Sequence, residues 1–268
     1  MTSSFKTPKE IAKTVSDIAK IKESPKITNL LLLSFLAGCY IAFGALLAEV
    51  ATAGMLTSGF PVGLEKFVFG AMFPLGLITV ILTGAELFTG NVLYMTVGVL
   101  DEVSSLKGLT RNWILSWIFN FIGALFIAYV IAYLGGIMPA DPAAPTYAIT
   151  QKAVGVAQSK VDLSFTSALI KGIGCNWLVC LAVWLANSTD NVISKIAAIW
   201  IPIMAFVTIG FEHCIANMFF IPLGIFLQAD GVNWINFIVN NLVPVTIGNI
   251  IGGALFVGCI YWYTYLKN

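Results

Sequence analysis

Two short stretches of the sequence decide the fold, GAELFTGN at residues 84–91 and GFEHCIAN at residues 210–217. Both read Gly-x-Glu-x-x-x-x-Asn, they lie 126 residues apart, and each interrupts a long apolar run. Non-helical backbone inside a membrane is tolerated only where it is buried in protein or lines a water-filled cavity. We therefore expect two interrupted membrane helices at equivalent positions of an internal repeat.

The rest of the chain supports this interpretation because it is too apolar for a soluble fold. Of the 268 residues, 59% are hydrophobic and 10% are charged, whereas soluble domains have roughly 25% charged residues. A spanning helix needs about 20 predominantly apolar residues. Six runs meet this requirement: residues 30–52, 67–100, 113–136, 165–186, 196–227 and 239–266. We predict an all-α membrane protein with six transmembrane helices.

A second pair of motifs strengthens the repeat. Asn120-x-x-Gly123 in the third run matches Asn249-x-x-Gly252 in the sixth, 129 residues apart. Each half then holds three spans, so the halves enter the membrane in opposite directions. This predicts an inverted 3+3 repeat with interrupted helices 2 and 5, an arrangement typical of transport proteins that bind solute near the bilayer midplane.

The positive charges are unevenly divided between the two sides. Ten of them lie on the side that carries both termini: Lys6, Lys9, Lys13, Lys20, Lys22, Lys26, Lys107, Arg111, Lys195 and Lys267. The opposite loops contain Lys66, Lys152 and Lys160, and Lys171 lies just inside the fourth span. The positive-inside rule therefore places both termini of a multi-pass cell-membrane protein in the cytoplasm. A net charge of +1 gives no indication of a nucleic-acid partner.

The first 26 residues are too polar for a signal peptide. Thr7-Pro8-Lys9-Glu10 is a capping box with proline at the first helical position, and apolar residues follow at helical spacing. We predict that residues 1–28 form a cytoplasmic amphipathic N-terminal helix lying against the membrane surface. A frayed basic tail is the alternative. Residues 29–268 would form the six-span transmembrane channel domain.

No cofactor, metal site or disulfide framework is expected. The five cysteines all fall in apolar runs: Cys39, Cys175, Cys180, Cys214 and Cys259. Cys175 and Cys180 lack the second Cys or His pair that a zinc site would need, so small apolar packing residues are the better interpretation. Soluble catalytic motifs are also missing from the sequence, which favours a protein that is not an enzyme.

Polar residues inside a membrane are costly and are therefore functional candidates. His213, the only histidine, lies in the second break, and an imidazole can exchange a proton near neutral pH. Thr89 offers a hydroxyl that both donates and accepts, although it could equally bond back to its own helix. Glu86 and Glu212, each followed five positions later by Asn91 or Asn217, are interpreted as structural carboxylates that hold the breaks together.

Three stretches resemble signatures of the formate/nitrite transporter family: residues 82–90 (LTGAELFTG), 172–182 (GIGCNWLVCLA) and 210–219 (GFEHCIANMF). The resemblance covers nearly the whole chain and implies an aquaporin-like protomer, assembled as a homopentamer with one pore in each protomer. It also implies small monovalent anions such as formate, nitrite or hydrosulfide as substrates. Residues 42–49 and 244–249 look most like formate-handling members. The long Pro- and Ala-rich connection at residues 139–158 departs from the family pattern.

Carried over from the family, His213 matches the central pore histidine and Thr89 the threonine of the first break. Lys160 matches a lysine of the vestibule, the wide mouth of the pore, where an ammonium would concentrate anions. Asn176 and Asn249 match polar pore or helix-packing positions. Apolar residues that would narrow the pore, or lie near its narrowing, are Phe73, Leu77, Leu87, Phe88 and Phe206.

These residues suggest a mechanism with two variants. An anion drawn by Lys160 would reach Thr89 and His213, take a proton, and cross the apolar narrowing as a neutral acid, because an isolated anion is far more costly there. Alternatively, His213 stays neutral and only hydrogen-bonds the solute. Two other protein classes fit poorly: a neutral-solute channel should show paired Asn-Pro-Ala segments, and a haem-binding membrane subunit should show two histidines.

Overall fold

A computed structural model describes residues 5–267; residues 1–4 of the predicted N-terminal helix segment and Asn268 of the predicted channel domain lie outside the described residues. The described chain is helical, without strands. In order, its elements are α1 (Pro8–Lys22), α2 (Ile27–Thr52), α3 (Val62–Met72), α4 (Leu75–Thr83), α5 (Phe88–Leu100), α6 (Leu106–Phe126), η1 (Ile127–Leu134), α7 (Tyr147–Val161), α8 (Phe165–Ala186), α9 (Val192–Ile209), α10 (Cys214–Phe226), α11 (Trp234–Asn236), η2 (Phe237–Leu242), α12 (Val243–Gly253), η3 (Ala254–Cys259) and α13 (Ile260–Tyr265).

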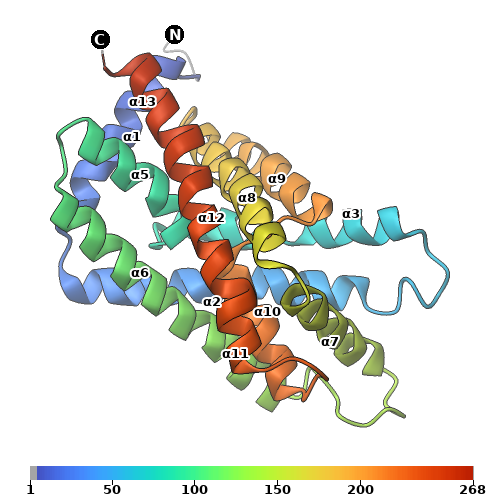
Figure 1. Ribbon diagram of the computed structural model, residues 1–268. Helices are drawn as coiled ribbons and strands as arrows, with labels where there is room; N and C mark the ends of the chain where they lie inside the picture. Colours follow the sequence, from blue (N-terminus) through green and yellow to red (C-terminus); the bar gives the residue numbers. More distant parts are fainter. Residues whose placement is uncertain (1–4, 268) are drawn as a thin grey trace.

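The described residues contain six helical stretches that are long and apolar enough to cross a membrane, as the sequence predicted. They are α2, α3 with α4, α6 with η1, α8, α9, and the continuous stretch from α11 to α13 (Figure 1). The half-helices α5 and α10, of 13 residues each, are too short to span and are almost entirely buried. They lie between the spanning helices, where their backbone is shielded from lipid.

Both predicted helix breaks are present. The helix α4 ends at Gly84 with φ 73°, and α9 ends at Gly210 with φ 87°. This left-handed conformation is readily available to glycine and costly for other residues. The chain then runs without helical structure for a few residues before α5 and α10 begin. A further interruption at Phe73 and Pro74, between α3 and α4, was not predicted.

The two halves are held together internally by matching helix pairs, α2 with α6 and α8 with α12. A Cβ atom on Gly123 would lie 2.0 Å from the Phe35 carbonyl oxygen, and one on Gly252 would lie 2.2 Å from that of Ile173. Only glycine allows backbones to approach this closely. The predicted asparagine and glycine motifs therefore mark the tightest helix contact of each half.

The repeat extends to a segment where the sequence predicted a loop. Residues 147–158 of the expected 139–158 connection are helical and belong to α7. Small residues allow this helix to pack closely on α10: a Cβ atom on Gly224 would lie 2.3 Å from the Cβ of Ala157. With 15 residues and a position directly before α8, α7 is the counterpart of α1, which has 15 residues and precedes α2.

The helix α1 has the predicted capping box, in which the Thr7 hydroxyl accepts from the Glu10 amide and the Glu10 carboxylate accepts from the Thr7 amide. Its apolar face differs from the expectation of a helix resting on a membrane surface. Ile11, Val15 and Ala19 are buried against α5 and the C-terminal helix α13. The protein itself covers this face.

Candidate functional site

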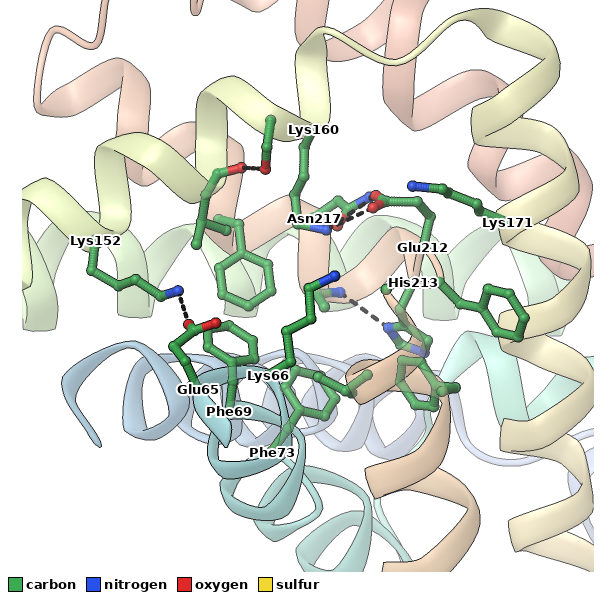
Figure 2. Close-up of a pocket in the computed structure, with 18 residues that line it drawn as sticks. Glu65, Lys66, Phe69, Phe73, Lys152, Lys160, Lys171, Glu212, His213 and Asn217 are labelled. Atoms are coloured by element: carbon green, nitrogen blue, oxygen red, sulfur yellow. Dashed lines mark hydrogen bonds and ion pairs between the residues drawn. The ribbon is translucent and has the colours of Figure 1, made fainter. Parts of the chain in front are cut away.

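A cavity of about 330 Å³ opens at the end of the molecule that carries α7, away from the termini, and reaches inward to the break before α10 (Figures 1 and 2). Its walls combine phenylalanine rings with six charged side chains: Glu65, Lys66, Lys152, Lys160, Lys171 and Glu212. We call it the lysine cavity. His213 and Phe73 lie at its inner end, and Phe206, which packs against both rings, also lines the cavity.

His213 is fixed at the inner end of this cavity by two hydrogen bonds. It is the N-cap residue of α10, and its Nδ1 accepts from the Ala216 amide at 3.1 Å. Its Nε2 lies 2.9 Å from the Thr89 hydroxyl oxygen. A nitrogen that accepts must carry a lone pair, so a neutral ring carries its hydrogen on Nε2. His213 then donates to Thr89, whose own hydroxyl hydrogen is left for another acceptor.

Thr89 brings the first half-helix to the same point. It is the second residue of α5 and is fully buried. Its carbonyl oxygen accepts from the Asn176 side chain at 3.2 Å and from the Cys180 thiol at 3.4 Å. The two breaks therefore meet at the contact between Thr89 and His213, two residues that are 124 positions apart in sequence.

The backbone of each break is held by an asparagine from another helix. Asn120 accepts from the Phe88 amide and donates to the carbonyls of Ser34 and Glu86. Asn249 accepts from the Cys214 amide and donates to the carbonyls of Gly172 and Glu212. The asparagine side chains, and not the two glutamate carboxylates, thus bind the freed backbone groups, because a side-chain amide can both donate and accept.

The glutamates instead form buried ion pairs that repeat in both halves. Glu212 accepts from Lys160 at 3.1 Å and from Asn217 at 2.7 Å. In the other half, Glu86 pairs with Lys22 at 2.7 Å and accepts from Asn91 at 2.7 Å. Each lysine crosses from the end of α7 or α1 to the break of its own half.

Lys160 lines the lysine cavity, but its ammonium group is ion-paired. Its side chain is 12% exposed, bonds both oxygens of Glu212, and lies 5.3 Å from the Phe220 ring centre. Lys22 was missed as a site residue. The match between Lys160 and Lys22 becomes visible only once α7 is recognised as the counterpart of α1.

Apolar side chains close the inner end of the cavity. The rings of Phe73 and Phe206 meet edge to face with centres 5.8 Å apart, and Phe206 lies 6.0 Å from the His213 ring. The other predicted constriction residues, Leu77, Leu87 and Phe88, are buried but do not line the lysine cavity. Asn176 and Asn249 also lie away from it and bind backbone carbonyls.

Four charged residues that line the cavity were not predicted as site residues: Glu65, Lys66, Lys152 and Lys171. Three of them stood out in the sequence only as the few lysines on the side opposite the termini. Glu65 forms an ion pair with Lys152. Two residues so far apart in sequence show no pattern that would join them.

Comparisons with known proteins agree with this geometry. The family model described as formate/nitrite transporter matches residues 9–263. A probable formate transporter of Methanothermobacter thermautotrophicus is 57% identical over 100% of both chains. A solved structure titled FNT family ion channel has a TM-score of 0.83 at 31% identity, covering 95% of this chain and 98% of that one. Another, titled pentameric formate channel with formate bound, has a TM-score of 0.77 at 35% identity, covering 89% and 97%. The chain belongs to the formate/nitrite transporter family.

Proposed function

We propose that the protein is a channel for small monovalent anions, with formate as its substrate, and that it is not an enzyme. The contact between Thr89 and His213 at the end of the lysine cavity carries the proposal. The names of the relatives support formate over nitrite and hydrosulfide, which other members of the family would conduct.

The arrangement supports a passage in three steps. Formate enters the lysine cavity as an anion, attracted by its excess of lysines over glutamates. At its inner end the Thr89 hydroxyl donates a hydrogen bond to a formate oxygen, because His213 supplies the hydrogen bond that Thr89 accepts. The solute crosses between Phe73 and Phe206 as formic acid, with a proton taken from the water of the cavity and returned to water beyond the apolar side chains, because a bare anion is costly there and a neutral acid is not.

Of the two mechanistic variants, we favour the one in which the resting His213 is neutral. The Ala216 amide already points at Nδ1, so a hydrogen on Nδ1 would face another hydrogen. His213 then orients Thr89 and completes the donor set without itself giving up a proton. A relay would have to break the contact with Ala216 in every cycle.

Reconstituted protein would test both the substrate and the role of His213. Purified wild type in liposomes should conduct formate faster than nitrite or hydrosulfide, and no formate flux would overturn the substrate assignment. His213→Gln retains a side-chain donor and should keep part of the flux with an unchanged pH profile, whereas His213→Ala should lose most of it. Loss of pH dependence in both variants would instead favour the relay.

We also propose that both termini lie in the cytoplasm of the cell and that the lysine cavity faces outward. The distribution of lysine and arginine supports this orientation. Reporter fusions at each terminus that are active only in the cytoplasm should both be active. If a reporter that is active only outside the cell is active at the termini, the proposed orientation is reversed.

A further inference from the structure

The lysine cavity contains two kinds of lysine. Lys160 and Lys152 are each paired with a buried carboxylate, Glu212 and Glu65 respectively. These pairs bring almost no net charge to the cavity, because each ammonium faces a carboxylate of which only about a twentieth is exposed. They hold α7 against the break before α10 and against α3.

Lys66 and Lys171 are the second kind. Among residues 5–267, no ion pair or hydrogen bond reaches either ammonium group. Lys66 is exposed on α3, and Lys171 is half-buried on α8. Figure 2 shows them extending into the cavity from different sides, Lys66 from α3 and Lys171 from α8 toward Glu212. The net positive charge of the cavity therefore resides on these two side chains.

Comparison of the two halves of the inverted repeat shows which lysines occur in both halves and which occur in one half only. The carbonyl of Lys171 accepts from the Glu212 amide at 3.3 Å, and the carbonyl of Leu33 accepts from the Glu86 amide at 3.2 Å. Lys171 and Leu33 are thus equivalent positions, 138 residues apart like Lys160 and Lys22. The ion-paired lysine is repeated, but the unpaired Lys171 is leucine in the other half.

The same comparison applies to Lys66. At the spacing of 126 residues that relates the two breaks, its counterpart is Val192. Lys66 thus has no charged counterpart at this spacing, although Lys195 lies one helical turn further along α9. Since the other half packs with leucine at the position of Lys171, packing does not require that charge.

We propose that Lys66 and Lys171 form the capture site for the substrate anion at the mouth of the lysine cavity. Unpaired ammonium groups between low-dielectric walls raise the local anion concentration and can raise association rates by about 10- to 1,000-fold. The inference rests on the proposed anion-channel function. It identifies the residues that set the apparent affinity of the channel for formate.

Uptake of isotope-labelled formate by right-side-out membrane vesicles tests the proposal. The variants are Lys66→Gln, Lys171→Gln and the double variant, with Lys107→Gln as a matched control that removes an exposed lysine elsewhere. We expect the double variant to raise KM about tenfold with little change in maximal rate. The steep salt dependence of wild-type uptake should flatten in this variant. Replacement of both residues by arginine should retain the wild-type KM.

The possible outcomes separate the two proposals. Formate uptake by wild type with an unchanged KM and salt dependence in the double variant would overturn the capture site and leave the channel function standing. An equal rise in KM for Lys107→Gln would also overturn it, because the effect would then be general surface charge. No formate uptake by correctly assembled wild type would overturn the function itself.

Discussion

At the scale of single residues, the site depends on how Thr89 and His213 orient each other. His213 is bound at both ring nitrogens, so its ring cannot turn without breaking a hydrogen bond. The hydroxyl of Thr89 is the group left to meet the solute. Each residue could be predicted from its break and the family resemblance, but their contact could not, because 124 residues separate them.

Replacing Thr89 tests this arrangement directly. Thr89→Val keeps the shape but removes the hydroxyl, and a hydrogen bond to a charged group is worth about 1.5–3 kcal/mol. Formate flux through liposomes should therefore fall roughly tenfold or more. Thr89→Ser retains the hydroxyl and should stay near the wild-type rate. A valine variant at the wild-type rate would contradict a direct role for Thr89.

Unlike Thr89 and His213, Glu49 is a buried polar residue whose side chain has no hydrogen-bond partner among the described residues. It lies on α2, is fully buried, and neither carboxylate oxygen has a hydrogen-bond partner among the described residues. A buried polar group without a hydrogen bond costs about 1–3 kcal/mol. Glu49→Met, which is apolar and similar in length, should raise the thermal unfolding temperature in detergent.

A carboxylate with a partner provides the control. Glu65→Met leaves the half-buried Lys152 without its ion pair and should lower the unfolding temperature. If both methionine variants shift the unfolding temperature in the same direction, the distinction between paired and unpaired carboxylates fails.

At the scale of the elements, each broken helix is repaired by one asparagine of a neighbouring helix. Asn249→Ala would leave two backbone groups of the second break, the Cys214 amide and the Glu212 carbonyl, without this partner, at about 1–3 kcal/mol each. We expect a large fall in unfolding temperature and loss of flux, while Asn240→Ala, an asparagine on the same span, should change little. If the Asn249 variant unfolds at the wild-type temperature, the second break does not depend on the hydrogen bonds of Asn249 for its stability.

The start of α1 should respond to pH. The hydrogen bonds from the Thr7 amide and hydroxyl hold the pKa of the Glu10 carboxyl below its usual value. A carboxyl with a lowered pKa stabilises the folded state above the pKa of the unfolded chain, and this contribution disappears as the pH falls through the lowered pKa. Hydrogen exchange at the first turn of α1 should therefore speed up in acid.

Glu10→Gln is the matched variant for this effect. Glutamine can complete a capping box but does not titrate in this range. Its exchange at the first turn should change less on acidification than that of the wild type. Equal acceleration in both proteins would assign the effect to another group.

Patterns in the sequence predicted some elements and missed others for physical reasons. The breaks were predictable because a charged residue beside glycine contrasts sharply with its apolar surroundings. The helix α7 was missed because its buried face consists of Thr150, Ala153, Ala157 and Val161, which differ little in polarity from a loop. The charged contacts of the lysine cavity were missed because they join α7 to α3 and to the break before α10, and spacing along one helix says nothing about contacts between separate elements.

At the scale of the whole molecule, three spans are the least covered. Only 22% of the α9 span, 33% of the α3–α4 span and 33% of the α6–η1 span are buried within the protomer. Such surfaces suit lipid or another protomer, and the family resemblance favours five copies. Native mass spectrometry in mild detergent should therefore show a species of five times 28.8 kDa. A protomer that stays monomeric at every detergent concentration would contradict this expectation.

The pairing of α7 with α1 has a consequence for how the chain could be divided. Each half contains one short amphipathic helix, three spans and one half-helix, and the only covalent link between them is the stretch between η1 and α7. A cut after residue 141 would therefore yield two polypeptides that are each a whole repeat. When both polypeptides are synthesised in one cell, they should associate in the bilayer and restore formate flux. Two polypeptides produced by a cut inside α2 should not restore it.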